Sequence, residues 1–136
     1  MHADPGFDSI LETALYHRTS EAAVVKRFYR EVLGLAQVAG WEDGMAFRVG
    51  PGVLLLFDRE KLPQRSGPIA AHGATGPGHA CVLARDGDYD AWKVRLEADG
   101  VEIVHEHDWE SGFRSFYFTD PAGNLLEIAD GDLWPR

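Results

Sequence analysis

Apolar and polar residues alternate over several short stretches of the chain, and two longer segments carry apolar residues at helical spacing. The alternation predicts a strand over 10–16 and another over 79–84. The first helix is expected to begin near Ser20 as N-cap and to stop at Gly34, and the second to run from near Asp88 to Gly100. Their apolar stripes consist of Val24, Val25, Phe28, Val32 and Leu33 in the first helix and of Tyr89, Trp92 and Leu96 in the second.

The segment from Ser115 to Ile128 has the pattern of a strand, a tight turn and a second strand. Its residues 120–123, Asp-Pro-Ala-Gly, fit a type I turn, with Asp at the first corner, Pro at the second and Gly at the fourth. A similar hairpin is expected earlier in the chain, with strands over 45–49 and 53–57 and a Gly-Pro-Gly turn between them.

The two halves of the chain therefore repeat one order of elements, a strand, a helix and three further strands. Gly34 corresponds to Gly100, Glu12 to His79 and Gly52 to Gly123, at a nearly constant offset. The physical interpretation is two βαβββ modules, over 10–58 and 78–130, in one domain. Residues 59–77 are rich in Gly, Pro and Ala and are predicted to be a linker, and residues 1–9 and 131–136 are predicted to be tails, the first of them flexible.

Length, charge and cysteine content limit the classes of function. The 136 residues suffice for one domain with a real core. A net charge of −9 and a pI near 5.0 argue against nucleic acid or an anionic membrane as partner. No apolar run reaches transmembrane length, and no secretory signal is seen. The single cysteine excludes an internal disulfide and favours a cytoplasmic location.

Glu127 is the one charged residue in an otherwise apolar strand. Burying a lone carboxylate costs several kcal/mol unless a partner such as a metal ion neutralises it. Strand alternation fixes which residues share a strand face with Glu127, with Glu12 and with His79. The residues that share these faces are Ile10, Ala14 and Tyr16 with Glu12, Cys81 and Leu83 with His79, and Leu125 and Ala129 with Glu127.

Three motifs in this order and spacing carry a family resemblance. They are Phe-Tyr-Arg-Glu-Val-Leu-Gly-Leu over 28–35, Gly-Pro-Gly-His over 76–79, and Asp-Pro-Ala-Gly-Asn-Leu-Leu-Glu over 120–127. The chain resembles the vicinal oxygen chelate superfamily, which groups glyoxalase I, extradiol dioxygenases, and bleomycin- and fosfomycin-resistance proteins. The resemblance implies an α+β fold in which the mixed sheets of two βαβββ modules curl into a cup around a divalent metal.

The resemblance also implies a set of metal ligands. Carried over by position, they are Glu12, His79 and Glu127, while the last-strand position of the first module falls on Leu56, which cannot bind metal. At position 12 this chain has Glu, where many members of the superfamily have His or Gln. This oxygen-rich set suits Mn²⁺, Fe²⁺, Mg²⁺ or Zn²⁺ and does not choose among them. The catalytic acid or base stays unassigned, with Glu12 or Glu127 as possible choices.

Further residues are candidates for the substrate pocket. They are Tyr16, Trp41, Phe47, Cys81, Trp109, Arg114 and Tyr117. Trp41 and Phe47 fit a pocket wall or plain core equally well, and surface exposure is the alternative for Arg114. His105 and His107 share a strand face and could hold a metal, although a solvated position is the favoured interpretation. His72 in the linker is expected to be exposed to solvent, unless the linker closes over the cup.

Two functions of different classes follow from the resemblance. The first is a metal-dependent enzyme acting on a small substrate with vicinal oxygens, by isomerase, lyase or transferase chemistry and less readily as an oxygenase. The alternative is a metal-free protein that binds a drug or metabolite, as bleomycin-resistance members do, and a ligand sensor is a weaker third. Such proteins usually form homodimers, and some exchange modules, so Glu12 would then come from the other subunit. The sequence leaves that arrangement open.

Overall fold

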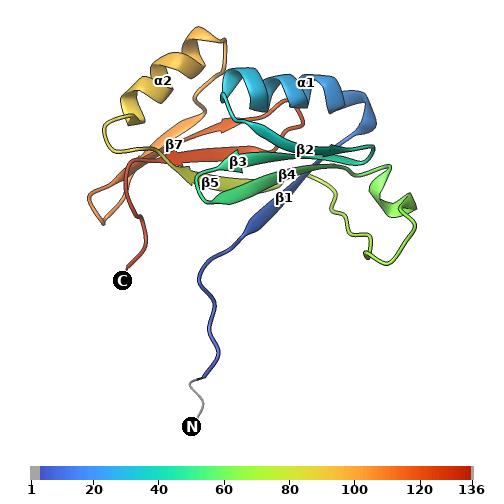
Figure 1. Cartoon of the computed structure of the whole chain (residues 1–136). Helices are drawn as coiled ribbons and strands as arrows, with labels where there is room; N and C mark the ends of the chain where they lie inside the picture. The colour runs from blue at the N-terminus through green and yellow to red at the C-terminus, as the bar shows by residue number, and fades with distance from the viewer. Residues whose placement is uncertain (1–3, 136) are drawn as a thin grey trace.

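The computed structural model of the protein describes residues 4–135 and contains two copies of one βαβββ arrangement (Figure 1). The strands of the first module are β1 Glu12–His17, β2 Gln37–Trp41, β3 Gly44–Val49 and β4 Gly52–Asp58. Those of the second are β5 His79–Leu83, β6 His105–Asp108, β7 Arg114–Thr119 and β8 Leu125–Ala129. The predicted repeat is confirmed, with strand ends within two residues of the expected positions.

Each module forms its own four-stranded sheet. The strand orders are β1-β4-β3-β2 and β5-β8-β7-β6. In both sheets the first and last strands of the module are parallel neighbours, and the remaining pairs are antiparallel. The parallel pairing of β5 with β8 brings the strand of His79 directly beside the strand of Glu127.

Helix α2, Tyr89–Ala98, agrees with its prediction, since it follows Asp88 and is succeeded by Gly100 at a φ of 79°. The first helical segment starts earlier than predicted. A 3-10 turn at Thr19–Glu21 leads into α1, Ala22–Arg27, and a π-helical turn follows at Phe28–Val32. Arg18 rather than Ser20 is the N-cap, because the Glu21 carboxylate accepts the Arg18 backbone N–H at 2.8 Å.

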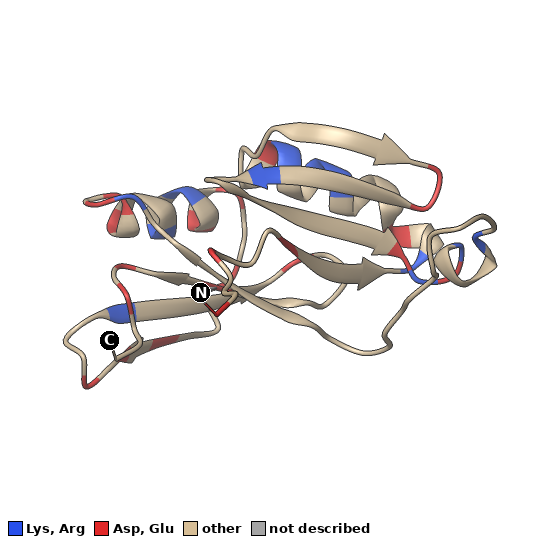
Figure 2. Cartoon of the chain, turned by 60° about the horizontal axis from the view of Figure 1, so that its bottom comes forward, with Lys and Arg blue, Asp and Glu red and all other residues tan. Residues whose placement is uncertain are grey.

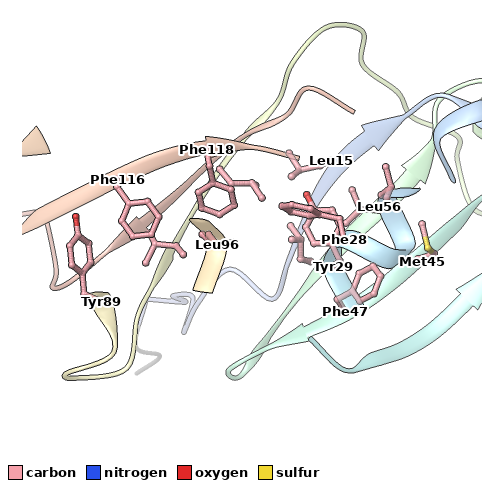
Figure 3. Packing of buried hydrophobic residues seen from close by; sticks show 14 residues of the cluster. Leu15, Phe28, Tyr29, Met45, Phe47, Leu56, Tyr89, Leu96, Phe116 and Phe118 are labelled. Carbon is pink, nitrogen blue, oxygen red and sulfur yellow. The ribbon is translucent and has the colours of Figure 1, made fainter. Parts of the chain in front are cut away.

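Both helices lie on the same side of the two sheets, and the main core fills the space between the helices and the sheets (Figures 1 and 3). Tyr29 and Phe47 are both fully buried there, and their rings stack at 5.5 Å. Leu56 and Phe118 enter the same cluster from the two sheets. One apolar core therefore spans both modules.

Buried hydrogen bonds around the predicted Asp120–Gly123 turn join the modules. The turn is closed by the Gly123 N–H, which donates to the Asp120 carbonyl at 3.0 Å. The Tyr29 hydroxyl donates to the Asp120 carboxylate at 2.6 Å. Asn124 donates to the Tyr16 carbonyl at 3.0 Å and accepts the Gly78 N–H at 2.9 Å. These contacts fix β1 close to the start of β5.

The linker is folded against the first sheet. Leu62 is fully buried, and Arg65 donates two hydrogen bonds of 2.7 and 2.8 Å to the Asp43 carboxylate. The His72 ring meets the Phe57 ring edge-on at 4.8 Å. The linker thus forms a wall on the sheet face opposite the helices.

The N-terminal arm, residues 4–11, extends beyond the first sheet (Figure 1). Lys and Arg gather on the helices and nearby loops, while the strands carry few charges (Figure 2). Among the described residues no helix combines the length and the apolar sequence needed to cross a membrane.

Candidate metal centre

Each sheet has one face covered by helices and one turned away from them, called the open face below. Ala80, Val82, Leu126 and Ile128 pack into the core under the helices, so the alternate residues of β5 and β8 belong to the open face. The open face of the second sheet carries His79, Cys81, Glu127 and Tyr117, with Cys81 beside Glu127 and Tyr117 on its other side.

His79 and Glu127 form the centre of this face. His79 Nδ1 lies 2.8 Å from the Leu125 carbonyl oxygen. A carbonyl only accepts hydrogen bonds, so Nδ1 carries a proton and a neutral imidazole presents a lone pair at Nε2. That Nε2 lies 3.2 Å from Glu127 Oε1, which is also an acceptor. Two acceptors at this distance need either a proton or a cation between them.

Glu127 is only 5% exposed, and its Oε2 is a buried side-chain atom without a hydrogen-bond partner among residues 4–135. Protonation of His79 would satisfy Oε1 and leave the flanking Cys81 and Tyr117, whose hydrogen bonding to Glu127 contributes to their raised pKa values, as the remaining donors. A divalent cation would satisfy both residues at once. Two ligands about 2.1 Å from one ion, at right angles, lie about 3 Å apart, close to the observed spacing. The donor set therefore fits a metal.

The two flanking groups are held in their protonated forms. Although Cys81 as a whole is exposed, desolvation of its thiol, followed by the charge of Glu127 and hydrogen bonding to it, raises the pKa of Cys81 to about 12. Burial also raises the pKa of Tyr117, against a hydrogen bond to Ser115 that lowers it, and Glu127 adds to the rise. The Tyr117 ring stacks near His79, with centroids 6.2 Å apart. Both groups can donate a hydrogen bond at the centre.

Glu12 does not reach this pair within one chain. It is exposed at the start of β1, and residues 4–135 contain no cluster of three His, Cys, Asp or Glu side chains able to hold a metal. β1 approaches β5 further along, where a Cβ on Gly78 would come within 2.7 Å of the Leu15 side chain. Within one chain, the described residues therefore bring His79 and Glu127 together without Glu12.

The counterpart of Glu127 in the first module is Leu55, and the assignment to Leu56 was wrong. Leu55 pairs with Ala14 of β1 as Glu127 pairs with Cys81 of β5. Leu56 is fully buried on the helix-covered face. The conclusion that this position cannot bind metal still holds for Leu55.

Comparison with known proteins settles the family. The model of the Glyoxalase/Bleomycin resistance protein/Dioxygenase superfamily matches residues 10–128. The chain belongs to this superfamily. It is similar to a crystal structure of lactoylglutathione lyase from Agrobacterium tumefaciens, with 38% identity, a TM-score of 0.88, and 97% of this chain and 100% of the other covered.

Two curated relatives of the superfamily are transferases. A metallothiol transferase, FosB, from Staphylococcus epidermidis is 29% identical over 88% of this chain and 83% of its own. A glutathione transferase, FosA, from Serratia marcescens is 31% identical over 80% of this chain and 72% of its own. The predicted family and its fold are thus confirmed.

The aromatic candidates of the first module separate into wall and core. Trp41 and Tyr16 lie against Phe57, with centroids 6.4 and 6.3 Å apart, and the Tyr16 hydroxyl is 2.5 Å from His72 Nδ1. They line the open face of the first sheet. Phe47 is fully buried beneath the helices, so it cannot line a pocket on that face. Phe57 and His72 belong to the wall, and sequence reasoning had not singled out Phe57.

The candidates of the second module also separate. Arg114 lies over the Tyr89 ring at 4.6 Å and 3.4 Å from Asp130, so it serves the helix-covered side and is not a pocket residue. Trp109 donates to the Ser115 hydroxyl at 2.9 Å and meets the His107 ring at 4.6 Å. Trp109 therefore extends the open face of the second sheet beyond Tyr117. The rings of His105 and His107, 5.8 Å apart, are exposed on this face, and no third ligand among residues 4–135 joins them.

Proposed function

We propose that this protein is a metal-dependent enzyme that acts on a small substrate with neighbouring oxygens, by transferase or lyase chemistry. The observation that carries the proposal is the His79–Glu127 pair, in which Nε2 and Oε1 lie 3.2 Å apart and the second carboxylate oxygen is buried without a hydrogen-bond partner among the described residues. The names of the similar proteins support a thiol compound as one reactant, since they are a metallothiol transferase, a glutathione transferase and lactoylglutathione lyase.

The residues around the centre have distinct roles in this proposal. A bound dication supplies Lewis acidity toward a substrate oxygen. His79 binds through Nε2, and the Leu125 carbonyl orients its ring. Glu127 supplies negative charge from a site shielded from water. Tyr117 keeps its proton, because its pKa is raised mainly by burial, and donates it in a hydrogen bond to substrate. Cys81 pairs with Glu127 in the register of β5 and β8 and has no assigned chemical role.

The third ligand in this proposal is Glu12 of a second copy of the chain. Two carboxylates and one neutral imidazole balance a dication. In each chain both open faces lie on the side away from the helices, so a second copy can place its first sheet opposite the second sheet of its partner (Figure 1). The aromatic wall around Phe57 would then close the cup over the metal.

Metal analysis tests the centre itself. Protein purified without chelator is expected to contain about one divalent ion per chain by elemental analysis, and Glu127→Ala to contain none. Glu106→Ala is the matched control, because Glu106 lies in the same sheet but pairs with Lys93 and Tyr89. Absence of metal from the unmodified protein, after addition of Mn²⁺, Fe²⁺, Mg²⁺ and Zn²⁺ in turn, would refute the enzyme proposal.

Mixed dimers test the sharing of the site. Glu12→Ala and Glu127→Ala chains are each expected to bind no metal. A heterodimer of the two keeps one complete site if Glu12 crosses between chains, since one chain supplies Glu12 and the other supplies His79 with Glu127. The mixture should then recover about half the metal of the unmodified dimer at full heterodimer content. No recovery would show that Glu12 does not act across the interface.

One observation favours the alternative of a metal-free binding protein. Within residues 4–135 of a single chain no three side chains gather into a metal site, while the first open face offers an aromatic wall. A binder would hold an organic molecule against Tyr16, Trp41 and Phe57 without metal. The elemental analysis separates these functions, because the binder would be metal-free in every variant.

A further inference from the structure

A groove of about 520 Å³ lies between the two modules, beside the helices. Its walls are largely apolar, formed by Leu33, Val49, Leu54, Ala80, Val82 and Trp92. Arg48, Arg85 and Arg95 also line it, against the acidic residues Asp88 and Glu127, of which Glu127 is engaged by His79. Arg95 is fixed over the Trp92 ring at 5.0 Å and donates to the Glu31 carbonyl at 3.1 Å. Such a groove suits an occupant that is apolar and carries negative charge.

The N-terminal arm has the complementary chemistry. Phe7, Ile10 and Leu11 are 102%, 82% and 68% exposed, so three large apolar side chains of one short segment lie in water. The same segment carries Asp4 and Asp8 and no basic residue. An exposed apolar segment of this kind marks an interaction site, and its charge is opposite to that of the arginines in the groove.

We propose that the groove binds the N-terminal arm, residues 4–11, of a second copy of this chain. None of the described arm residues lines the groove of its own chain. The Leu11 carbonyl accepts the Val53 N–H at 3.0 Å, which holds the arm in line with β1, and the arm runs away from the sheets (Figure 1). Residues 7–11 contain neither Gly nor Pro, the residues that most readily reverse the chain. A second copy has no such constraint.

This inference rests on the proposed exchange of Glu12 and gives it a structural basis. Ala80 and Val82 of β5 line the groove with one face of their strand, and His79 stands on the opposite face, beside Glu127 of β8. Glu12 follows the arm directly in the sequence. An arm bound along β5, the edge strand of its sheet, brings the Glu12 of one copy to that edge, from which it passes to the open face to meet His79 and Glu127 of the other.

Charge exchange between arm and groove tests the contact. Sedimentation of the full chain should show a dimer, and removal of residues 2–9 should raise its dissociation constant about tenfold or more. Arg85→Glu and Asp8→Arg should each raise the dissociation constant, and their combination should restore it toward the original value. Arg27→Glu is the control, because Arg27 lies outside the groove and is 78% exposed. The control should leave the dissociation constant unchanged.

Three results would overturn the inference. The first is a dissociation constant that neither truncation nor charge exchange alters. The second is strong fluorescence of the apolar anion anilinonaphthalene sulfonate on the intact dimer that Arg85→Glu abolishes, since the groove would then be free for a small molecule. The third is a monomer whose groove admits this dye only after truncation, which would place the arm in its own groove. Metal content at high protein concentration reports on His79 and Glu127 independently, so a failed arm contact and a failed metal centre are distinguishable.

Discussion

Replacing Glu127 with Gln should stabilise the metal-free protein and at the same time abolish its response to metal. Glu127 Oε2 is buried without a hydrogen-bond partner among residues 4–135, and Oε1 lies 3.2 Å from His79 Nε2. A glutamine of the same shape carries no charge, and its amide N–H can donate to Nε2 when the imidazole is neutral. The substitution therefore removes an unsatisfied charge while keeping the packing.

The size of the effect follows from these contacts. An unsatisfied buried polar group costs about 1–3 kcal/mol. Part of this cost is offset, because His79 is about half exposed and admits water nearby. We expect Glu127→Gln to raise the free energy of unfolding of the metal-free protein by about 1–2 kcal/mol. For a domain of this size that corresponds to about 3–10 °C in Tm. Metal at a hundredfold excess over its Kd should add about 2.7 kcal/mol to the unmodified protein and nothing to the variant.

Thermal unfolding followed by circular dichroism, with chelator and then with added Mn²⁺ or Zn²⁺, measures both effects. The variant should be the more stable protein in chelator and the less stable one in metal. Glu106→Gln is the matched control and should not change the metal response, because Glu106 is bound to Lys93 and Tyr89 away from the centre. A lower Tm for Glu127→Gln in chelator would show that the carboxylate is already satisfied, and the argument for a cation would fail.

Three further predictions concern single side chains. Tyr29→Phe removes the hydroxyl that donates to Asp120 at 2.6 Å and should lower the free energy of unfolding by about 1–3 kcal/mol in urea titrations; an unchanged midpoint would contradict this. Cys81, with a pKa raised to about 12, should resist iodoacetamide near neutral pH in the metal-free folded protein and react after denaturation, as mass spectrometry can show. Hydrogen bonding to Arg65 lowers the pKa of Asp43, so their pair stabilises fully above the unfolded pKa and loses this contribution as pH falls through the folded pKa. As pH falls below about 4, the Asp43→Asn variant should therefore lose less stability than the unmodified protein. Parallel plots of unfolding free energy against pH for the two proteins would refute the stabilising role of the Asp43–Arg65 pair.

Local patterns were sufficient to predict most of the fold. Alternation, helix-ending glycines and the Asp120–Gly123 turn are signals within a few residues, and each predicted element exists in the structure. The proximity of His79 and Glu127 was also predictable, because the first and last strands of the second module are parallel neighbours. Counting from the turn glycines gave Leu56 instead of Leu55, since the turns before β4 and β8 differ in length.

The remaining errors arise where contacts are distant in sequence. Phe116 packs under α2, so the alternation of side chains along β7 would have put Arg114 on the same, helix-covered side. Only the ion pair with Asp130 shows where its guanidinium lies. Phe47 has the same apolar character as the wall residue Phe57, and their burial alone distinguishes them once the sheet is formed. The linker has no periodicity, so its anchors at Leu62 and at the Arg65–Asp43 pair could not be read from local pattern.

The two open faces carry different side chains, and under the proposed function this difference explains why the metal centre needs two chains. The position of Glu127 is occupied in the first module by Leu55, which packs with Phe57 and Leu62 into an apolar surface. The second open face carries the His79–Glu127 pair and Tyr117. A metal centre that excludes water needs both surfaces facing each other. Since both faces point away from the helices in the same chain, a second copy can meet this requirement, and it brings Glu12 on the same strand as Tyr16, which forms part of the wall.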